Sequence, residues 1–158
     1  MIYQICEKKD VQVLIRYLFE HKDEITPSAI EQMYMNESAV GMRIEHKMEI
    51  SILAIDDESH EVQGVISAIS PNVDQIWTIV ALHVLEKSRR HSVATNLIKK
   101  LKEELQKNYN SAKCQVSLYN SNRRTVACLI INGFEIEGKI SAIEKEKELI
   151  VFGLIDRK

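Results

Sequence analysis

The feature that most restricts the fold is a strand-like segment that runs into a basic loop and then into an amphipathic helix. Residues 75–84, QIWTIVALHV, are rich in β-branched and aromatic residues and contain neither glycine nor proline, which predicts a mostly buried strand. The segment EKSRRHS follows as a break. From Val93 onward the spacing becomes helical. The apolar positions of that helix are Leu97, Ile98, Leu101 and Leu105, with lysines and glutamates between them.

The junction between the basic loop and the helix has the properties of an anion site. The first N–H groups of a helix lack intrahelical partners, and the helix dipole favours negative charge near them. Arg89, Arg90 and His91 come just before the helix. Ser92 is expected to cap it, because a serine hydroxyl can accept a hydrogen bond from the first turn. For such a loop taken alone, a solvated connection without a ligand is the alternative interpretation.

A second segment combines a strand, an asparagine, a short helix and a glycine. Residues 116–122, VSLYNSN, alternate and end in a turn, and residues 123–131 predict a helix. Asn122 is expected to cap that helix, and Gly133, followed by Phe134, is expected to terminate it in the left-handed conformation. The order of strand, polar turn and helix therefore occurs at a second place in the chain.

Together, the two segments resemble the cofactor-binding parts of the GNAT superfamily of N-acetyltransferases. The first is similar to the family's Q/R-x-x-G-x-G/A loop, with Arg89 at the first position, Ala94 at the last, and Ser92 where the family usually carries glycine. The second is similar to the family's strand, Asn, helix and Gly-Phe segment, through Asn122 and Gly133-Phe134. The order and separation of the two segments support the resemblance more than either segment alone, and it covers most of the chain.

The resemblance implies that the chain binds acetyl-CoA and transfers its acetyl group to a primary amine of a small molecule or a peptide. Backbone amides of the loop would hold the pyrophosphate, and the preceding strand would lie beside the pantetheine arm. The residues that the resemblance assigns to the cofactor are Val84, Arg89, Arg90, His91, Ser92, Val93, Ala94, Thr95 and Asn122. Two alternatives remain, a non-catalytic acyl-CoA sensor and an interaction domain that kept only the fold.

The side chains that many family members use for catalysis are replaced in this sequence. Leu129 stands where a tyrosine would protonate the leaving thiolate, and Thr78 stands near the position of a strand carboxylate. The catalytic candidates that remain are His83, whose ordinary pKa is ~6.5, and Tyr119. A structural role in the sheet is the alternative for both. Cys128 is interpreted as a buried helix cysteine and not as an acyl carrier.

The rest of the chain predicts the α/β fold that the resemblance implies, as one domain over residues 1–158. We expect a mixed, mostly antiparallel sheet of six to seven strands flanked by about four helices. The expected strands cover residues 2–6, 49–57, 62–70, 75–84, 114–119, 138–143 and 148–155, and the expected helices are capped by Asp10, Thr26, Ser92 and Asn122. Residues expected to shape the acceptor site are Tyr34, Met35, Glu37, Met42, Arg43 and Glu45.

Composition and charge argue against several classes of protein. The 21 lysines and arginines are balanced by 23 acidic residues, and a net charge of -2 disfavours a nucleic-acid partner. The apolar stretches are far shorter than the ~20 residues of a membrane span, and the first residues lack the pattern of a signal peptide. Cys6, Cys114 and Cys128 fit reduced thiols of a cytoplasmic protein and form no metal-binding pattern. The two C-terminal strands are candidates for the edge of a homodimer.

Overall fold

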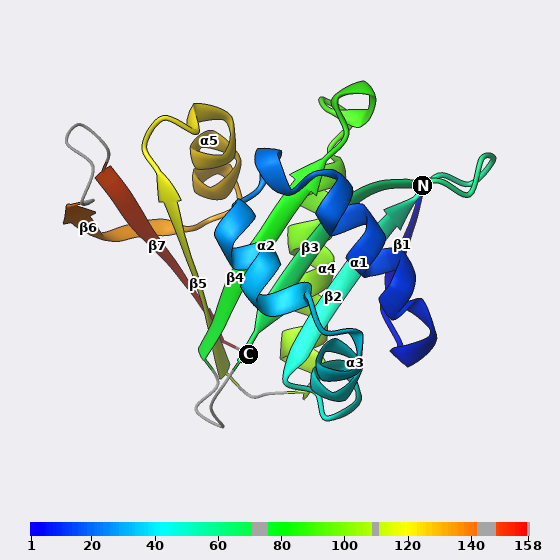
Figure 1. Ribbon diagram of the computed structural model, residues 1–158. Helices are drawn as coiled ribbons and strands as arrows, with labels where there is room; N and C mark the ends of the chain where they lie inside the picture. The colour runs from blue at the N-terminus through cyan, green and yellow to red at the C-terminus, as the bar shows by residue number, and fades with distance from the viewer. Residues whose placement is uncertain (71–75, 109–110, 142–147, 158) are drawn as a thin grey trace.

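Seven strands form one mixed sheet with helices on both faces (Figure 1). The computed structural model describes residues 1–70, 76–108, 111–141 and 148–157. The strands are β1 (Ile2–Ile5), β2 (Glu49–Ile55), β3 (Val62–Ile69), β4 (Ile76–Val84), β5 (Ser111–Tyr119), β6 (Glu135–Ser141) and β7 (Glu148–Arg157), in the spatial order β1-β2-β3-β4-β5-β7-β6. Strands β4 and β5 pair in parallel, and all the other neighbours pair antiparallel.

Five α-helices and three short 3-10 helices connect the strands. The α-helices are α1 (Val11–Glu20), α2 (Pro27–Tyr34), α3 (Glu37–Glu45), α4 (Val93–Asn108) and α5 (Arg123–Ile131). The 3-10 helices are η1 (Lys8–Asp10), η2 (Lys22–Glu24) and η3 (Glu86–Ser88). This order confirms the predicted α/β architecture and adds one helix to it.

Helix α3 is the element that the sequence did not predict. Only Val40 and Gly41 are buried on it, so its apolar pattern is too sparse to show a helical period. Its start is nevertheless well defined, because Oδ1 of Asn36 accepts a hydrogen bond of 3.1 Å from the N–H of Ala39. Strand β6 begins three residues before the start that the sequence predicted, and its predicted end lies outside the described residues. The first residue of the predicted 75–84 strand also lies outside them.

Two of the predicted helix caps differ from expectation. Oδ2 of Asp10 accepts the N–H of Glu7 at 2.9 Å, so the carboxylate closes the short helix η1 and makes no capping hydrogen bond to α1. The hydroxyl of Thr26 donates to the carbonyl oxygen of the residue before it and does not cap α2. Asn122 does cap α5 as predicted, because its Oδ1 accepts the N–H of Thr125 at 3.3 Å.

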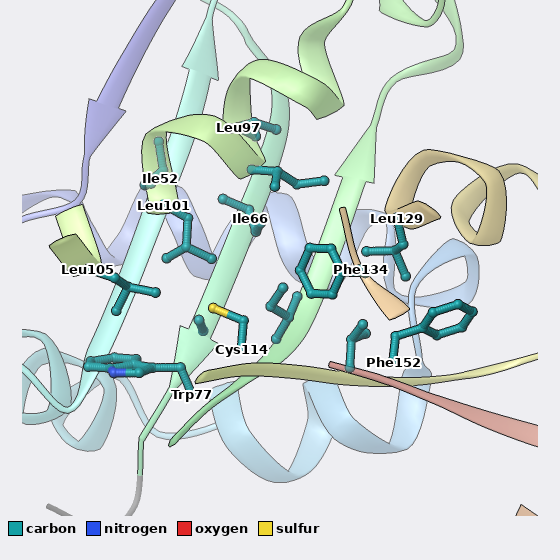
Figure 2. Close-up of a cluster of buried hydrophobic side chains, with 14 of the residues drawn as sticks. Ile52, Ile66, Trp77, Leu97, Leu101, Leu105, Cys114, Leu129, Phe134 and Phe152 are labelled. Atoms are coloured by element: carbon teal, nitrogen blue, oxygen red, sulfur yellow. The ribbon is translucent and has the colours of Figure 1, made fainter. Parts of the chain in front are cut away.

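Helix α4 packs across one face of the sheet and forms the larger part of the core (Figure 2). Its buried side chains contact the inward side chains of the strands beneath it and the residues around α5. Figure 2 shows Leu97, Leu101 and Leu105 of α4 in one cluster with Ile52, Ile66, Trp77, Cys114, Leu129, Phe134 and Phe152. The prediction that Trp77 and Phe134 are core residues is confirmed, since both are buried.

Helices α1, α2 and α3 cover the opposite face of the sheet, in front of β2 to β4 in Figure 1. A buried polar cluster lies within this layer. Glu49 is 3% exposed and accepts hydrogen bonds from Tyr34 at 3.0 Å, from Nε of Arg43 at 2.8 Å and from Ser51 at 2.8 Å. Tyr34, which was predicted to lie near the acceptor, has a fully buried side chain whose hydroxyl donates to Glu49.

Helix α5 ends as the sequence predicts. Gly133 has a φ of +88°, its N–H donates to the carbonyl of Ile130 at 3.0 Å, and the N–H of Phe134 donates to the carbonyl of Leu129 at 3.0 Å. These two hydrogen bonds around a left-handed residue form a Schellman motif, which satisfies carbonyl groups of the last helical turn. It also turns the chain back toward the sheet, where β6 begins.

Within the described part of the chain, no helix combines the length and the apolar character needed to cross a membrane.

Candidate active site

Strands β4 and β5 separate soon after they pair. Their parallel register joins Ile76, Trp77 and Thr78 to Lys113, Cys114 and Gln115, and no further β4–β5 pair forms among the described residues. Beyond these pairs the two strands diverge, as Figure 1 shows, and α5 lies across the opening. Residues 79–84 of β4 therefore keep backbone groups on their β5 side that no strand satisfies.

A β-bulge in β4 decides which side chains face which layer. Ser67 of β3 pairs with Ala81 and Ala68 pairs with Ile79, so Val80 is the extra residue. Before the bulge, Ile79 points to the α4 core; after it, Ala81 belongs to the α1–α3 core. Because side chains alternate along a strand, the bulge turns His83 toward α1.

The loop between β4 and α4 adopts an unusual backbone conformation for its residue types. Arg90 has a φ of +68° and Ser92 has a φ of +59°. The carbonyl of Ser92 accepts the N–H of Asn96 at 2.9 Å, so Ser92 is the residue at which the helix begins. Its hydroxyl makes no hydrogen bond to any described residue, contrary to the predicted side-chain cap. The N–H groups of the first helical turn thus remain available to a ligand.

A cavity of about 360 Å³ lies where the two predicted segments meet. The residues that line it are Glu24, Leu82, His83, Val84, Arg89, Ala94, Asn122, Arg124, Thr125 and Cys128. Of the predicted site residues, the structure thus brings together His83, Val84, Arg89, Ala94 and Asn122. Glu24 is the acidic residue in this set, and Arg89 and Arg124 are the basic ones.

The other predicted site residues lie outside this lining. Arg90, His91 and Ser92 are exposed in the loop, and Val93, the first residue of α4, is buried. Thr95 accepts a hydrogen bond of 3.3 Å from Nδ2 of Asn132, which ties the first turn of α4 to the end of α5.

Tyr119, the candidate for proton donation to the thiolate, and Leu129, which stands at the position of the family's tyrosine, both lie outside the lining of the cavity. Tyr119 is at the end of β5 and is 43% exposed. Leu129, at the position of the family's tyrosine, is fully buried in the core. Its neighbour Cys128 lines the cavity, half-buried, and burial raises the pKa of its thiol. A general acid at Tyr119 therefore stays a prediction.

His83 belongs to a polar cluster that the sequence did not show. Its side chain is buried, 5% exposed, and its Nδ1 lies 2.9 Å from the hydroxyl of Tyr17. Its Nε2 lies 3.3 Å from Oε2 of Glu24 but has no well-formed hydrogen bond. The same carboxylate oxygen accepts a hydrogen bond of 2.7 Å from Nη2 of Arg89, and the ring of His21 stacks on that of His83 with centroids 4.8 Å apart.

Burial and neighbouring charges set the protonation states of this cluster. Burial lowers the pKa of His83 below its ordinary value, although Glu24 opposes the shift. The hydrogen bond from Arg89, and after it the nearby imidazole of His83, lower the pKa of Glu24. Burial raises the pKa of Tyr17, so its hydroxyl keeps its proton and can donate to Nδ1 of His83. We assign the remaining imidazole proton to Nε2, since that nitrogen faces the carboxylate.

No signal along the sequence could have found Tyr17, His21 or Glu24. Tyr17 and His83 are separated by 66 positions, and Tyr17 follows the same helical pattern as its purely structural neighbours. The cluster depends on α1 packing against the part of β4 that follows the bulge, which is a tertiary feature.

His21, Glu24 and His83 also bring three potential metal ligands together, with their ligand atoms within 4.8 Å of one another. A tetrahedral ion with bonds of ~2.0–2.1 Å needs ligand atoms about 3.4 Å apart. The rings of His21 and His83 are stacked and nearly parallel, so the lone pairs of their nitrogens do not point toward one common ion. The carboxylate of Glu24 is already paired with Arg89. The cluster in this arrangement therefore fits a hydrogen-bonding role better than metal coordination.

No family model matches the sequence, and no curated protein sequence matches it either. Solved structures do match the fold over almost the whole chain. An acetyltransferase of the GNAT family from Streptococcus pneumoniae has a TM-score of 0.75 at 15% identity and covers 98% of each chain.

Two further structures show the same likeness. A ribosomal-protein-S5-alanine acetyltransferase from Vibrio fischeri has a TM-score of 0.73 at 13% identity, over 98% of this chain and 93% of that one. A variant of spermidine N-acetyltransferase from Vibrio cholerae has a TM-score of 0.73 at 12% identity, over 99% of this chain and 95% of that one. The fold of this chain is that of the GNAT acetyltransferases, as the resemblance implied.

Proposed function

We propose that this protein is an N-acetyltransferase that uses acetyl-CoA to acetylate a primary amine. The observation that carries the proposal is the divergence of β4 from β5, which opens onto the cationic start of α4 at a cavity lined by both predicted segments. A fold alone does not define an activity, so the proposal depends on these residues.

The residues around the cavity fit an acyl-CoA molecule. The first turn of α4 offers unpaired N–H groups, and Arg89, Arg90 and Arg124 add positive charge near them, which suits a diphosphate. The unpaired edge of β4 after Thr78 can bind an extended amide chain by adding to the sheet. Bound acetyl-CoA supplies an acetyl group activated as a thioester, which becomes an amide of the acceptor while coenzyme A leaves as a thiol.

The polar cluster at the end of β4 can receive the proton that the amine must lose. An amine attacks only in its neutral form, and a carboxylate or imidazole near the cavity can take its proton. Glu24 faces the cavity as a carboxylate, and His83, neutral because burial lowers its pKa, lies directly behind it. Tyr17 holds the imidazole in place through Nδ1. Glu24, with the Nε2–H of His83 behind it, would thereby take the place of the strand carboxylate that Thr78 cannot supply.

An acceptor panel tests the proposal. Purified protein is incubated with acetyl-CoA and single amines, including spermidine and an alanine-terminated peptide, the acceptors that two structural neighbours carry in their names. Release of the coenzyme A thiol is measured, and mass spectrometry identifies the acetylated product. We expect an amine-dependent thiol release with a stoichiometric gain of acetyl on one acceptor. Binding of acetyl-CoA without acetylation of any amine would contradict the enzymatic assignment.

One observation favours a second function, a non-catalytic acyl-CoA sensor. Leu129 fills the position of the family's tyrosine and is completely buried, so no side chain at this position can protonate a thiolate. In a sensor, acetyl-CoA would bind without turnover and would raise the melting temperature. The acceptor panel separates the two functions, because only the enzyme consumes acetyl-CoA.

The proposed reaction suits a cytoplasmic protein. No disulfide joins Cys6, Cys114 and Cys128, as is usual in a reducing compartment. A homodimer through the sheet edge at β6 stays a prediction, which the molar mass of the protein in solution would test.

A further inference from the structure

We propose that Glu24 binds the ammonium group of the acceptor, and that Arg89 masks Glu24 until the cofactor binds. The inference rests on the proposed function, because it requires an anionic cofactor beside Arg89 and an amine acceptor. It assigns an acceptor residue in η2, a residue that is not among those named from the sequence for this role.

The position of Glu24 suits a cation that enters the cavity. Helix η2 places Glu24 between α1 and α2, and its side chain lines the cavity while remaining 54% exposed. Among the described residues that line the cavity, it alone carries a negative charge. A carboxylate is the side chain that forms strong charge-assisted hydrogen bonds with an ammonium group.

Arg89 occupies this carboxylate in the unliganded protein. Its Nη2 donates to Oε2 of Glu24 at 2.7 Å, and its Nε donates to the carbonyl of Val84 at 2.9 Å. Arg89 is also the first residue of the loop that precedes the free amides of α4. A diphosphate bound at those amides competes with Glu24 for the guanidinium, which binds phosphate oxygens well. Cofactor binding then releases Glu24 to the acceptor.

The buried imidazole behind Glu24 supports a ligand at this place. Nε2 of His83 is a buried polar atom without a well-formed hydrogen bond, and it lies 3.3 Å from the same carboxylate oxygen that Arg89 holds. When Arg89 leaves, His83 can donate to that oxygen and keep the carboxylate at the cavity wall. The polar group that the unliganded state leaves unsatisfied is thereby satisfied in the loaded state.

The first experiment measures the affinity of free coenzyme A by calorimetry. Glu24→Gln should tighten binding about twofold to fivefold, because the guanidinium no longer has to leave an exposed ion pair of modest strength. Asp23→Asn is the matched control, since it removes one negative charge from the neighbouring exposed residue, which makes no ion pair with a described residue. Its affinity should equal that of the wild type.

A double substitution separates masking from a general charge effect. In an Arg89→Ala background, Glu24→Gln should leave the affinity for coenzyme A unchanged. Equal tightening in both backgrounds, equal tightening by Asp23→Asn, or weaker binding of the Glu24→Gln variant would overturn the masking of Glu24 by Arg89.

The second experiment tests the acceptor half with n-butylamine, an ammonium ion at neutral pH. With coenzyme A bound, n-butylamine should shift the NMR signal of the ¹³C-labelled Glu24 carboxyl group in a saturable manner. Without coenzyme A, its affinity should be about twofold to fivefold weaker, because coupling between two ligands is reciprocal. No saturable shift, or equal affinity in both states, would overturn the acceptor assignment.

The wild-type titration distinguishes this inference from the proposed function. If the wild-type protein binds no coenzyme A, both proposals fall. If it binds coenzyme A and the Glu24→Gln and n-butylamine results are negative, only the role of Glu24 falls.

Discussion

Ser92 adopts a backbone conformation that favours glycine, at the position where the GNAT loop usually carries glycine. Its φ of +59° is in the left-handed region, which costs a residue with a Cβ atom about 1 kcal/mol. Ser92 thus carries a Cβ atom in a conformation that glycine adopts most easily. The expected consequence is a cost in stability.

Ser92→Gly should raise the free energy of unfolding by about 0.5–1 kcal/mol, because glycine adopts a positive φ without steric cost. Urea unfolding measures this change. Ser92→Ala is the control, since it removes the hydroxyl and keeps the Cβ atom. If the alanine variant gained as much stability as the glycine variant, the hydroxyl and not the backbone would be the source of the strain.

The buried His83 should make the protein less stable as the pH falls. Burial holds its folded pKa below the ordinary ~6.5, so below that pH the unfolded chain binds a proton that the folded chain refuses. The free energy of unfolding should therefore fall as the pH drops from about 6.5 toward the lower folded pKa. Above pH ~6.5 this contribution should be constant.

His83→Gln should reduce the slope of stability against pH between about pH 5 and pH 6.5, measured by urea unfolding at each pH. The slope is compared, and not the absolute stability, because the substitution also alters the contact with Tyr17. His46→Gln, at an exposed site, is the control. A slope identical in wild type and His83→Gln would show that His83 is not the group that titrates.

At the scale of elements, the close approach of β3, β4 and α4 depends on Gly64. A Cβ atom at this position would lie 2.9 Å from the carbonyl oxygen of His83, 3.2 Å from Cγ2 of Val84 and 3.4 Å from Cδ1 of Leu97. The first of these contacts is with backbone, which cannot rotate away. Because Gly64 has no side chain, β3 can lie this close to the end of β4, from which the site is built.

Gly64→Ala should therefore lower the free energy of unfolding by about 1–3 kcal/mol, the usual cost of overpacking. Gly138→Ala in β6 is the matched control, because its Cβ atom would meet no atom within 4 Å, and its stability should change by less than about 0.5 kcal/mol. Equal effects of the two substitutions in denaturant unfolding would show that β3 and β4 can separate without cost.

Apart from α3, the order of the strands and α-helices was predictable because each carries its own local signal. Asn122 and Gly133 bound α5 as their residue types predict, and the apolar period of α4 is regular. The β-bulge at Val80 has no such signal, since every residue around it is an ordinary strand former. Without the bulge, alternation from Ile79 would have placed His83 in the α4 core, so the face of the sheet that His83 occupies could not be inferred from the sequence.

At the scale of the whole molecule, the candidate site joins three distant parts of the chain. The loop before α4 and the start of α5 were predictable from their sequence motifs, and the structure brings Arg89 and Asn122 to one cavity. The third part, with Tyr17 and Glu24, comes from the layer of α1–α3 on the other face of the sheet. Its contribution depends on packing across β4, which local patterns do not encode.

Four arginines lie around the starts of α4 and α5, where they make the local charge positive. The net charge is only -2, yet Arg89, Arg90, Arg123 and Arg124 all lie at the starts of α4 and α5. The attraction for a phosphorylated ligand is therefore local, and it should weaken as salt concentration rises.

Binding of acetyl-CoA where β4 and β5 diverge can be measured by calorimetric titration of acetyl-CoA into the purified protein. We expect one binding site per chain with a dissociation constant in the micromolar range, and weaker binding by the Arg89→Ala variant. An absence of binding at millimolar acetyl-CoA would overturn the proposed cofactor site and would leave this chain with the GNAT fold alone.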